Sequence, residues 1–379
     1  MKRNSYLIGF IMLIAILFSG CQGKSAAEGE TVAAVKKDVI KLKMATCWTP
    51  NYALIEQDKY WIGLVHELVG DQVEIQLFTA GELVKSNEVF DAVSNNTVQI
   101  GSDFPGYWAG KDTAFNLVAS FPMWMDAYDY INWLEFGGGL AEYERIYGNF
   151  NILPIPHGPI TVESGPRGTK PIKSLADYKG LKIRMSGKNQ GNILAQLGAS
   201  QVSISSAEVY QGLQRGLIDA AESCTPEFDW GLGYGETTTF SSHPGWHQPG
   251  SMGNLLFNKD AWNELPANVQ SAFRIAAKAT IARTLAFQDY SSADGTQKFR
   301  EAGVKEFKLS MEDLKTIADL SLEQIYKESA INPSFAKIAL SMGEYLHHYA
   351  PWRELSYPFN HGWKDKPLPD LDKIRPYAK

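Results

Sequence analysis

Two nearby segments of the chain read Ser174-Leu-Ala-Asp-Tyr-Lys-Gly-Leu-Lys-Ile-Arg-Met185 and Glu208-Val-Tyr-Gln-Gly-Leu-Gln-Arg-Gly-Leu-Ile-Asp-Ala-Ala-Glu222. Between Leu181 and Met185, apolar residues alternate with basic ones, as a pleated strand requires. The region from Leu175 to Glu222 is therefore predicted to form a strand, two helices and a further strand.

Arg184 falls near the carboxyl end of the first of these strands. Open α/β sheets bind ligands at that edge. A guanidinium is always charged and fork-shaped, so it suits the bidentate capture of a carboxylate. The alternative role for an arginine in a strand is a structural salt bridge.

Strands and helices alternate along the first half of the chain, which predicts a doubly wound α/β fold. The roughly 340 residues that follow the predicted tether are too many for a single hydrophobic core and predict two lobes. A hinge is expected near Gly158 and Gln248, where the chain passes between the lobes. The predicted strands are 39–47, 73–78, 99–102 and 152–156, and the predicted helices are 54–68, 82–93 and 126–147.

Helices are predicted for the part of the chain that follows the lobes. Pro266 can open a long helix that runs to about Gly303, because proline is tolerated at a helix start. Ser310-Met-Glu-Asp313 resembles a capping box that begins the next helix. The predicted organisation is a signal peptide (1–20), a tether (21–38), lobe I (39–157 with about 248–265), lobe II (158–247), C-terminal helices (266–349) and an extension (350–379).

The N-terminus has the pattern of an exported protein. Two basic residues precede an apolar run that is short for a membrane span, and Phe18-Ser-Gly-Cys21 follows. This ending resembles a bacterial lipobox, so Cys21 is predicted to be lipidated after cleavage. An uncleaved anchor and an ordinary signal peptide are the alternatives. Residues 22–38 are small, polar and charged, as in a flexible tether.

The net charge argues against a nucleic-acid partner. The whole chain carries −6 at pH 7, and removal of residues 1–20 takes away Lys2 and Arg3, which makes it more acidic. After Cys21, the cysteines are Cys47 and Cys224. Two thiols provide no metal-binding spacing; they either form one bridge or remain unpaired.

The Arg184 region resembles the solute receptors of TRAP (tripartite ATP-independent periplasmic) transporters, of the DctP type. In that family a "KGLKIR" strand carries the arginine that clamps the substrate carboxylate, and a helix and strand ending in "G-x-(I/V)-D-(A/G)-x-E" follow. Further landmarks of the family occur in the same order: Phe78-Thr-Ala-Gly-Glu-Leu-Val84, the segment Phe90–Gly101, Gly110-Lys-Asp112, Phe136-Gly-Gly-Gly139 and the segment Asn258–Pro266.

This resemblance implies a two-lobed fold like that of periplasmic binding proteins, with the cleft between the lobes and a long helix along both. It implies an extracytoplasmic receptor that delivers a small carboxylate to a membrane permease. The branch that is most similar binds 2-oxo acids, lactate and related acids. The C-terminal region, rich in Pro, Trp and Tyr, is expected to wrap a surface or to contact a second copy of the chain.

The resemblance also implies which aromatic residues line the cleft. Tyr107 and Trp108 precede Gly110-Lys-Asp112, where the 2-oxo-acid branch has paired aromatic residues. Trp246 is predicted to be a second wall of the cleft, and its neighbour His247 a further contact. On sequence alone, Tyr107 and Trp108 are equally compatible with a hydrophobic core, and a lone histidine is more often structural than ligand-binding.

Glu222 matches the glutamate that holds a cation in this branch, together with the backbone carbonyl of the next residue, here Ser223. Glu163 aligns loosely with the second cation ligand; the alternative is a surface position. A cation would neutralise both carboxylates beside Arg184, and oxygen ligands suit calcium. Two anionic ligands favour Ca²⁺ over Na⁺.

Two other classes of function compete with a transport receptor. A secreted hydrolase or lyase is disfavoured, because the sequence has no nucleophile elbow, no His-Glu-x-x-His and no phosphate-binding loop. A sensory lipoprotein of the same fold would share every feature described above.

Overall fold

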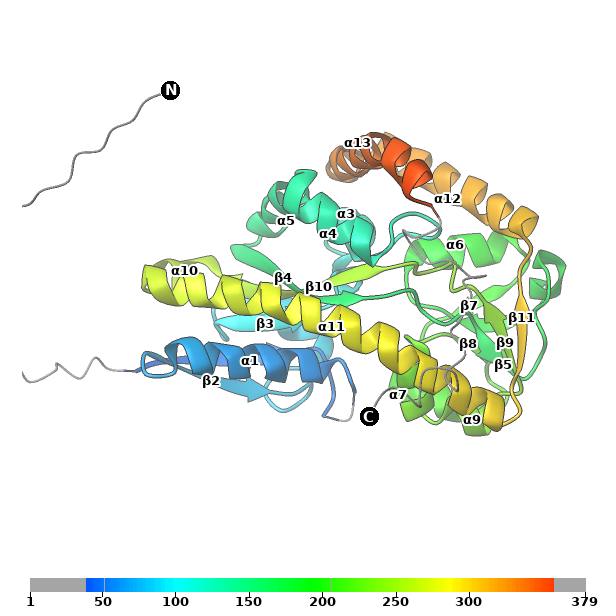
Figure 1. The fold of residues 1–379 in the computed structure, drawn as a ribbon, viewed down its shortest axis with the longest axis horizontal. Helices are drawn as coiled ribbons and strands as arrows, with labels where there is room; N and C mark the ends of the chain where they lie inside the picture. The colour runs from blue at the N-terminus through cyan, green and yellow to red at the C-terminus, as the bar shows by residue number, and fades with distance from the viewer. Residues whose placement is uncertain (1–38, 51, 205, 358–379) are drawn as a thin grey trace, which may run out of the picture. The chain divides into compact units, whose positions relative to one another are not determined.

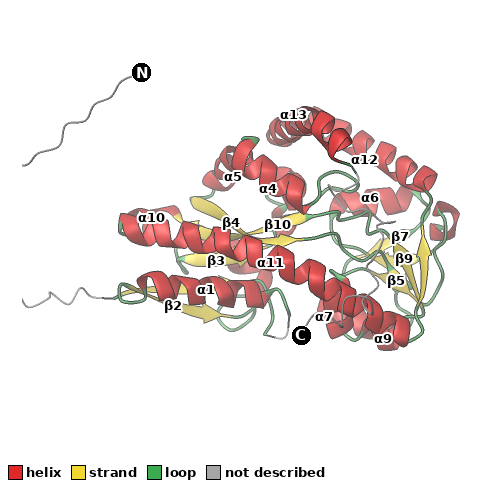
Figure 2. Ribbon diagram, in the orientation of Figure 1, coloured by secondary structure: helices red, strands yellow, loops and turns green. Residues whose placement is uncertain are grey.

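The computed structural model describes residues 39–50, 52–204 and 206–357. The strands of this part form two sheets, and helices pack against both (Figures 1 and 2). The predicted signal peptide, Cys21 and the tether lie outside the described residues. None of the described helices combines the length and the apolar character that a membrane crossing needs.

The first sheet contains five of the described strands. In spatial order they are β2 (Val73–Phe78), β1 (Ile40–Thr46), β3 (Ile100–Asp103), β10 (Ser251–Asn258) and β4 (Ile152–Ile160). β1 runs parallel to β2 and β3, whereas β10 runs antiparallel to β3 and β4. These positions confirm the four predicted strands of the first lobe, and β4 extends to Ile160.

The second sheet contains six of the described strands. They are β11 (Lys305–Lys308), β9 (Phe240–His243), β5 (Arg167–Gly168), β8 (Ala220–Ala221), β6 (Lys182–Arg184) and β7 (Ser200–Val202). The predicted strand with Arg184 at its end is β6. β11 was not predicted; its four residues follow the long helix and pair in parallel with β9.

Within the described residues, the chain passes between the sheets three times, the third time through the helices that lie between β10 and β11 in the sequence. It leaves the first sheet after Ile160 and enters the second at Arg167, then leaves β9 at His243 and returns at Ser251. Since Ile160 of β4 pairs with Ser251 of β10, the first crossing begins beside the point where the second ends.

Helices cover both sheets. They are α1 (Ile55–Val69), α2 (Val89–Ser94), α3 (Ala114–Ala119), α4 (Ala127–Phe136), α5 (Gly139–Gly148), α6 (Lys188–Gln196), α7 (Ser206–Gln214), α8 (Pro226–Gly231), α9 (Tyr234–Thr237), α10 (Lys259–Glu264), α11 (Ala267–Glu301), α12 (Met311–Ile331) and α13 (Pro333–Ser356). The predicted capping box at Ser310 is present: its hydroxyl accepts from the amide of Asp313.

Two helix predictions need correction. The expected helix 126–147 is two helices, because Gly138 adopts the left-handed region (φ 84°) between α4 and α5. The expected helix 82–93 begins later, with a 3-10 turn at Ser86–Glu88 and then α2. Its first residue, Glu82, instead accepts a hydrogen bond from the amide of Thr79 and closes a turn.

The long helix α11 packs against both lobes. It contacts α1 and β4 at one end (Figure 1) and α8 at the other. In the first lobe, the indole Nε1 of Trp61 donates to the carbonyl of Phe273, and the two rings pack edge to face. The predicted start after Pro266 is confirmed. α13 continues to Ser356, so the predicted extension from residue 350 begins within a helix, and its remainder from 358 lies outside the described residues.

Candidate ligand and cation site

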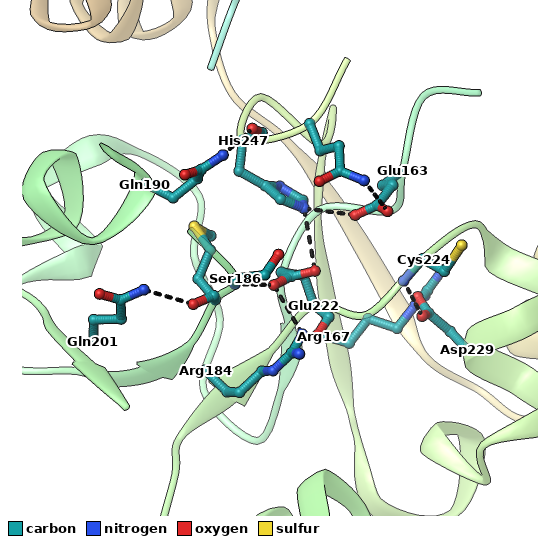
Figure 3. Close-up of polar contacts among 12 residues, drawn as sticks. Glu163, Arg167, Arg184, Ser186, Gln190, Gln201, Glu222, Cys224, Asp229 and His247 are labelled. Carbon is teal, nitrogen blue, oxygen red and sulfur yellow. Dashed lines mark hydrogen bonds and ion pairs between the residues drawn. The ribbon is translucent and has the colours of Figure 1, made fainter. Parts of the chain in front are cut away.

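Arg184 ends β6 and reaches a large cavity. Its Nη1 donates to the carbonyl of Glu222 at 2.7 Å and to Oε1 of Glu222 at 2.9 Å (Figure 3). Burial opposes the positive charge of Arg184, but Glu222, with smaller contributions from nearby tyrosines, outweighs burial and raises the guanidinium's pKa. The arginine is therefore held as a fixed positive charge at the cavity wall.

Glu163 lies in the crossing after β4 and Glu222 directly follows β8, but both converge on His247. The Nε2 atom of His247 lies 3.1 Å from Oε2 of Glu163 and 3.5 Å from Oε2 of Glu222. One ligand atom of each residue lies within 4.8 Å of the other two, and all three side chains are buried. This arrangement brings together the two predicted cation ligands, Glu163 and Glu222, and rules out a surface position for Glu163.

Hydrogen bonds fix the orientation of both carboxylates. Oε1 of Glu163 accepts from the side chain of Gln248 at 2.6 Å, and Oε1 of Glu222 accepts from the amide of Ser186 at 2.5 Å. Oε2 of Glu222 is buried and, within the described residues, has only the long contact of 3.5 Å with Nε2 of His247. A buried carboxylate oxygen without a close donor is the kind of atom that a cation satisfies.

The electrostatics of the two glutamates differ. Burial raises the pKa of Glu163 above its usual range, although its hydrogen bond with His247 opposes the shift. Burial also acts on Glu222, but Arg184, together with His247 and the amide of Ser186, outweighs it and holds the pKa of Glu222 below its usual range. Burial opposes the positive charge of His247, but its contacts with Glu163 and Glu222 outweigh burial and raise the pKa of its imidazole to about 9. The pKa of Glu163 stays raised although this imidazolium lies beside it, which fits a site that accepts further positive charge.

An aromatic wall from the first lobe faces Arg184 across the cavity. The cavity measures about 940 Å³, and Trp48, Tyr52, Tyr107 and Arg184 are among its lining residues. The ring of Trp48 lies 5.6 Å from that of Tyr52 and 6.4 Å from that of Tyr107, measured between centroids. The buried Nε1 of Trp48 has no hydrogen-bond partner in the described part of the chain. This N–H group is available to a ligand acceptor.

Two of the predicted wall residues, Trp108 and Trp246, do not line this cavity. Trp108 is buried in the first lobe, where its Nε1 donates to Asp103. Trp246 is buried in the second lobe, and its Nε1 donates to the hydroxyl of Tyr178 at 2.9 Å. In both cases the neighbouring residue faces the site instead. Tyr107, next to Trp108, lines the cavity, and His247, next to Trp246, contacts the two glutamates.

The sequence prediction missed Trp48, Tyr52 and Gln248. A signal for Trp48 was present, because it follows the carboxyl end of β1, at the same kind of sheet edge as Arg184. Ser223 follows Glu222 directly, and the role of its carbonyl as a cation ligand stays a prediction. Cys47 and Cys224 are buried free thiols, so the unpaired alternative holds.

Most of the chain matches a known family. Residues 44–332 match the model of the bacterial extracellular solute-binding proteins, family 7 (DctP). A monocarboxylate 2-oxoacid-binding periplasmic protein of Nostoc is 30% identical over 321 residues, which cover 84% of this chain and 88% of the relative.

Solved structures of TRAP solute-binding proteins have a similar fold. One from Bordetella bronchiseptica, with copurified calcium and picolinate, has a TM-score of 0.80 and 28% identity, covering 90% of this chain and 98% of that chain. One from Colwellia psychrerythraea, with calcium and pyruvate, has a TM-score of 0.79 and 27% identity, covering 84% and 97%. One from Pseudoalteromonas atlantica, with sodium and pyruvate, has a TM-score of 0.78 and 25% identity, covering 90% and 99%.

Proposed function

Because the chain belongs to family 7 of the bacterial extracellular solute-binding proteins, we propose that it is the extracytoplasmic receptor of a TRAP-type transporter and binds a small carboxylate with a cation. The observation that carries this proposal is the convergence of buried Glu163, Glu222 and His247 beside Arg184. Two buried carboxylates would repel an anionic ligand unless a positive charge lay between them and it.

In this proposal, the two glutamates bind the cation, and Arg184 and the aromatic residues bind the carboxylate ligand. Glu163 and Glu222 hold the cation, which neutralises them and attracts the ligand carboxylate. Arg184 pairs with that carboxylate through its guanidinium. Trp48 donates its free N–H to a ligand oxygen, and Tyr107 covers the ligand from the first lobe. The receptor binds, closes and releases its ligand unchanged; it is not an enzyme.

The ligand is proposed to be a 2-oxo acid or a close relative such as lactate. The similar structures contain pyruvate or picolinate with calcium or sodium. Both molecules carry a second donor atom next to the carboxylate, a keto oxygen or a ring nitrogen, and can chelate one cation. Two glutamate carboxylates favour Ca²⁺, while Na⁺ remains the monovalent alternative.

The location follows from the N-terminal sequence. We propose export, cleavage and lipidation at Cys21, with residues 22–38 as the tether that leaves the receptor on the membrane surface. The membrane subunits of the transporter are its proposed partner. The proposed lobes are 39–157 with about 248–265, and 158–247. A homodimer through the C-terminal region is the further proposed contact.

The test is to identify what the purified protein carries. Protein denatured after purification should release one small carboxylic acid per chain, detected by mass spectrometry, together with calcium or sodium, detected by elemental analysis. Calorimetry with the released acid should then give one binding event without turnover. Conversion of the acid into a product would contradict a receptor function.

A further inference from the structure

Arg167 is a buried cation behind the proposed cation site. Its Nε donates to Oδ2 of Asp229 at 3.0 Å, and its Nη2 donates to the hydroxyl of Ser164 at 3.0 Å. The guanidinium carbon lies 3.7 Å from the ring centre of Phe299 in α11. The side chain of Arg167 is 2% exposed and that of Asp229 is 0% exposed, so water screens this ion pair little.

The pair connects the two chain segments that carry the glutamates. Ser164 directly follows Glu163 and accepts the bond from Arg167. Oδ1 of Asp229 accepts from the amide of Cys224, two residues after Glu222, at 3.0 Å (Figure 3). The amide of Ser164 also donates to the carbonyl of Cys224 at 2.9 Å. A continuous network therefore links the backbone beside one glutamate to the backbone beside the other.

The long helix supports this network. Gly295 of α11 packs so closely on α8 that an added Cβ would lie 2.3 Å from the amide nitrogen of Glu227. One turn further along α11, the ring of Phe299 covers Arg167. The position of α8, and with it that of Asp229, is thus set by contact with α11.

Burying an ion pair in a protein core costs free energy, because both charges lose their hydration. Apolar side chains of similar volume often stabilise a fold as well or better, because no charge has to be desolvated. An apolar pair could not, however, donate to Ser164 and accept from the amide of Cys224. The directional bonds to these two segments are what the charged pair adds.

We propose that Arg167 and Asp229 are positioning residues that hold Glu163 and Glu222 at the spacing at which both can share one cation. This inference rests on the proposed function, because it assigns the pair a task in cation binding. Neither residue contacts the cation; Arg167 acts through the hydroxyl of Ser164, next to Glu163, and Asp229 through the amide of Cys224, close to Glu222.

The test compares Ca²⁺ binding by chelator-stripped protein, measured by calorimetry at a temperature where every variant is folded. Arg167→Lys and Asp229→Asn should each weaken Ca²⁺ binding by at least about tenfold. Ser164→Ala removes one bond without leaving a buried charge unpaired and should weaken binding severalfold. The matched control is Asp129→Asn, in a buried cluster of the first lobe with Tyr345 and Arg353. It should lower thermal stability and leave Ca²⁺ affinity unchanged.

Hydrogen exchange supplies a second readout. In Arg167→Lys the amides of Ser164 and Cys224 should exchange faster, while those of the first sheet keep their protection. Folded variants with the Ca²⁺ affinity of the wild type would overturn the inference. If both charge variants fail to fold, an unchanged affinity in Ser164→Ala would overturn it. A wild-type protein that binds neither Ca²⁺ nor Na⁺ would instead contradict the cation part of the proposed function, and this inference with it.

Discussion

His247 Nε2 lies 3.1 Å from Oε2 of Glu163, and both side chains are buried. These residues come from the first and second crossings between the sheets, so their contact depends on both crossings being in place. An incoming cation therefore meets carboxylates that are already oriented. Preorganisation of this kind reduces the cost of ordering the site when the ligand binds.

Arg184 should dominate the affinity for the ligand carboxylate. Arg184→Ala is expected to cost about 2–5 kcal/mol of binding, because a desolvated anion loses its charged partner. Arg184→Lys should recover only part of this, since lysine lacks the bidentate fork. Calorimetry with the acid released from the native protein measures both. Arg215→Ala, an exposed arginine of the same lobe, is the control and should bind normally.

Removal of the cation should weaken ligand binding by more than about tenfold, or 1.4 kcal/mol. Without it, two carboxylates repel the incoming anion and Arg184 alone opposes them. Added Ca²⁺ should restore binding and Mg²⁺ should do so poorly, because Mg²⁺ requires a tight octahedron and holds its waters. Glu222→Gln should reproduce the loss, whereas Glu236→Gln, at an exposed position, should not. Unchanged affinity after chelation in sodium-free buffer would falsify the cation-bridged site.

Trp48→Phe tests the N–H group of Trp48 separately from its aromatic character, because phenylalanine keeps a ring but has no N–H donor. The buried Nε1 has no hydrogen-bond partner in the described residues, so its loss should leave the free energy of unfolding unchanged or slightly higher. Ligand affinity should fall by roughly 1 kcal/mol, about fivefold, because one hydrogen bond to the ligand is removed. Paired denaturation and calorimetry measure the two effects. A loss of stability with normal affinity would assign Trp48 to the core alone.

Ligand binding should close the two lobes about the crossings between Ile160 and Arg167 and between His243 and Ser251. Small-angle scattering should give a smaller radius of gyration with saturating ligand than without it. The protein must first be unfolded and refolded to remove any copurified acid. Identical profiles for refolded protein with and without a ligand of proven affinity would contradict hinge closure.

His243 should make stability depend on pH. Burial, followed by the positive charge of Arg167, lowers the pKa of His243 to about 4; Lys308 and Arg300 add to this shift and Glu306 opposes it. In the unfolded chain the imidazole titrates near 6.5. Between about pH 6.5 and pH 4 the imidazole binds a proton in the unfolded state but not in the folded state. The free energy of unfolding therefore falls as the pH drops through this range.

His243→Gln should remove this penalty. Relative to the wild type, the variant should gain about 2–3 kcal/mol in free energy of unfolding between about pH 7.5 and about pH 4.5. Urea denaturation of both proteins at the two pH values measures the gain. An equal difference between variant and wild type at both pH values would show that His243 titrates normally in the folded protein.

Local patterns determined the elements and the position of Arg184. Alternating apolar residues around Ile183 define β6, and an arginine in the last position of such a strand lies at the ligand-binding edge whatever surrounds it. The capping box at Ser310 is equally local, since its bonds join residues three apart. Gly138 is also a local feature: the sequence pattern predicts it inside one helix, whereas its left-handed backbone separates α4 from α5.

Tertiary packing alone decided which aromatic and acidic side chains meet in the site. Tyr107 and Trp108 are adjacent aromatic residues, yet Tyr107 lines the cavity and Trp108 is buried in the core. The 3-10 turn that contains both points their side chains in different directions. The network from Arg167 through Asp229 to Cys224 joins residues more than fifty positions apart, as does the contact of Glu163 with His247. Contacts over such separations depend on how sheets and helices dock, and local periodicity carries no information about docking.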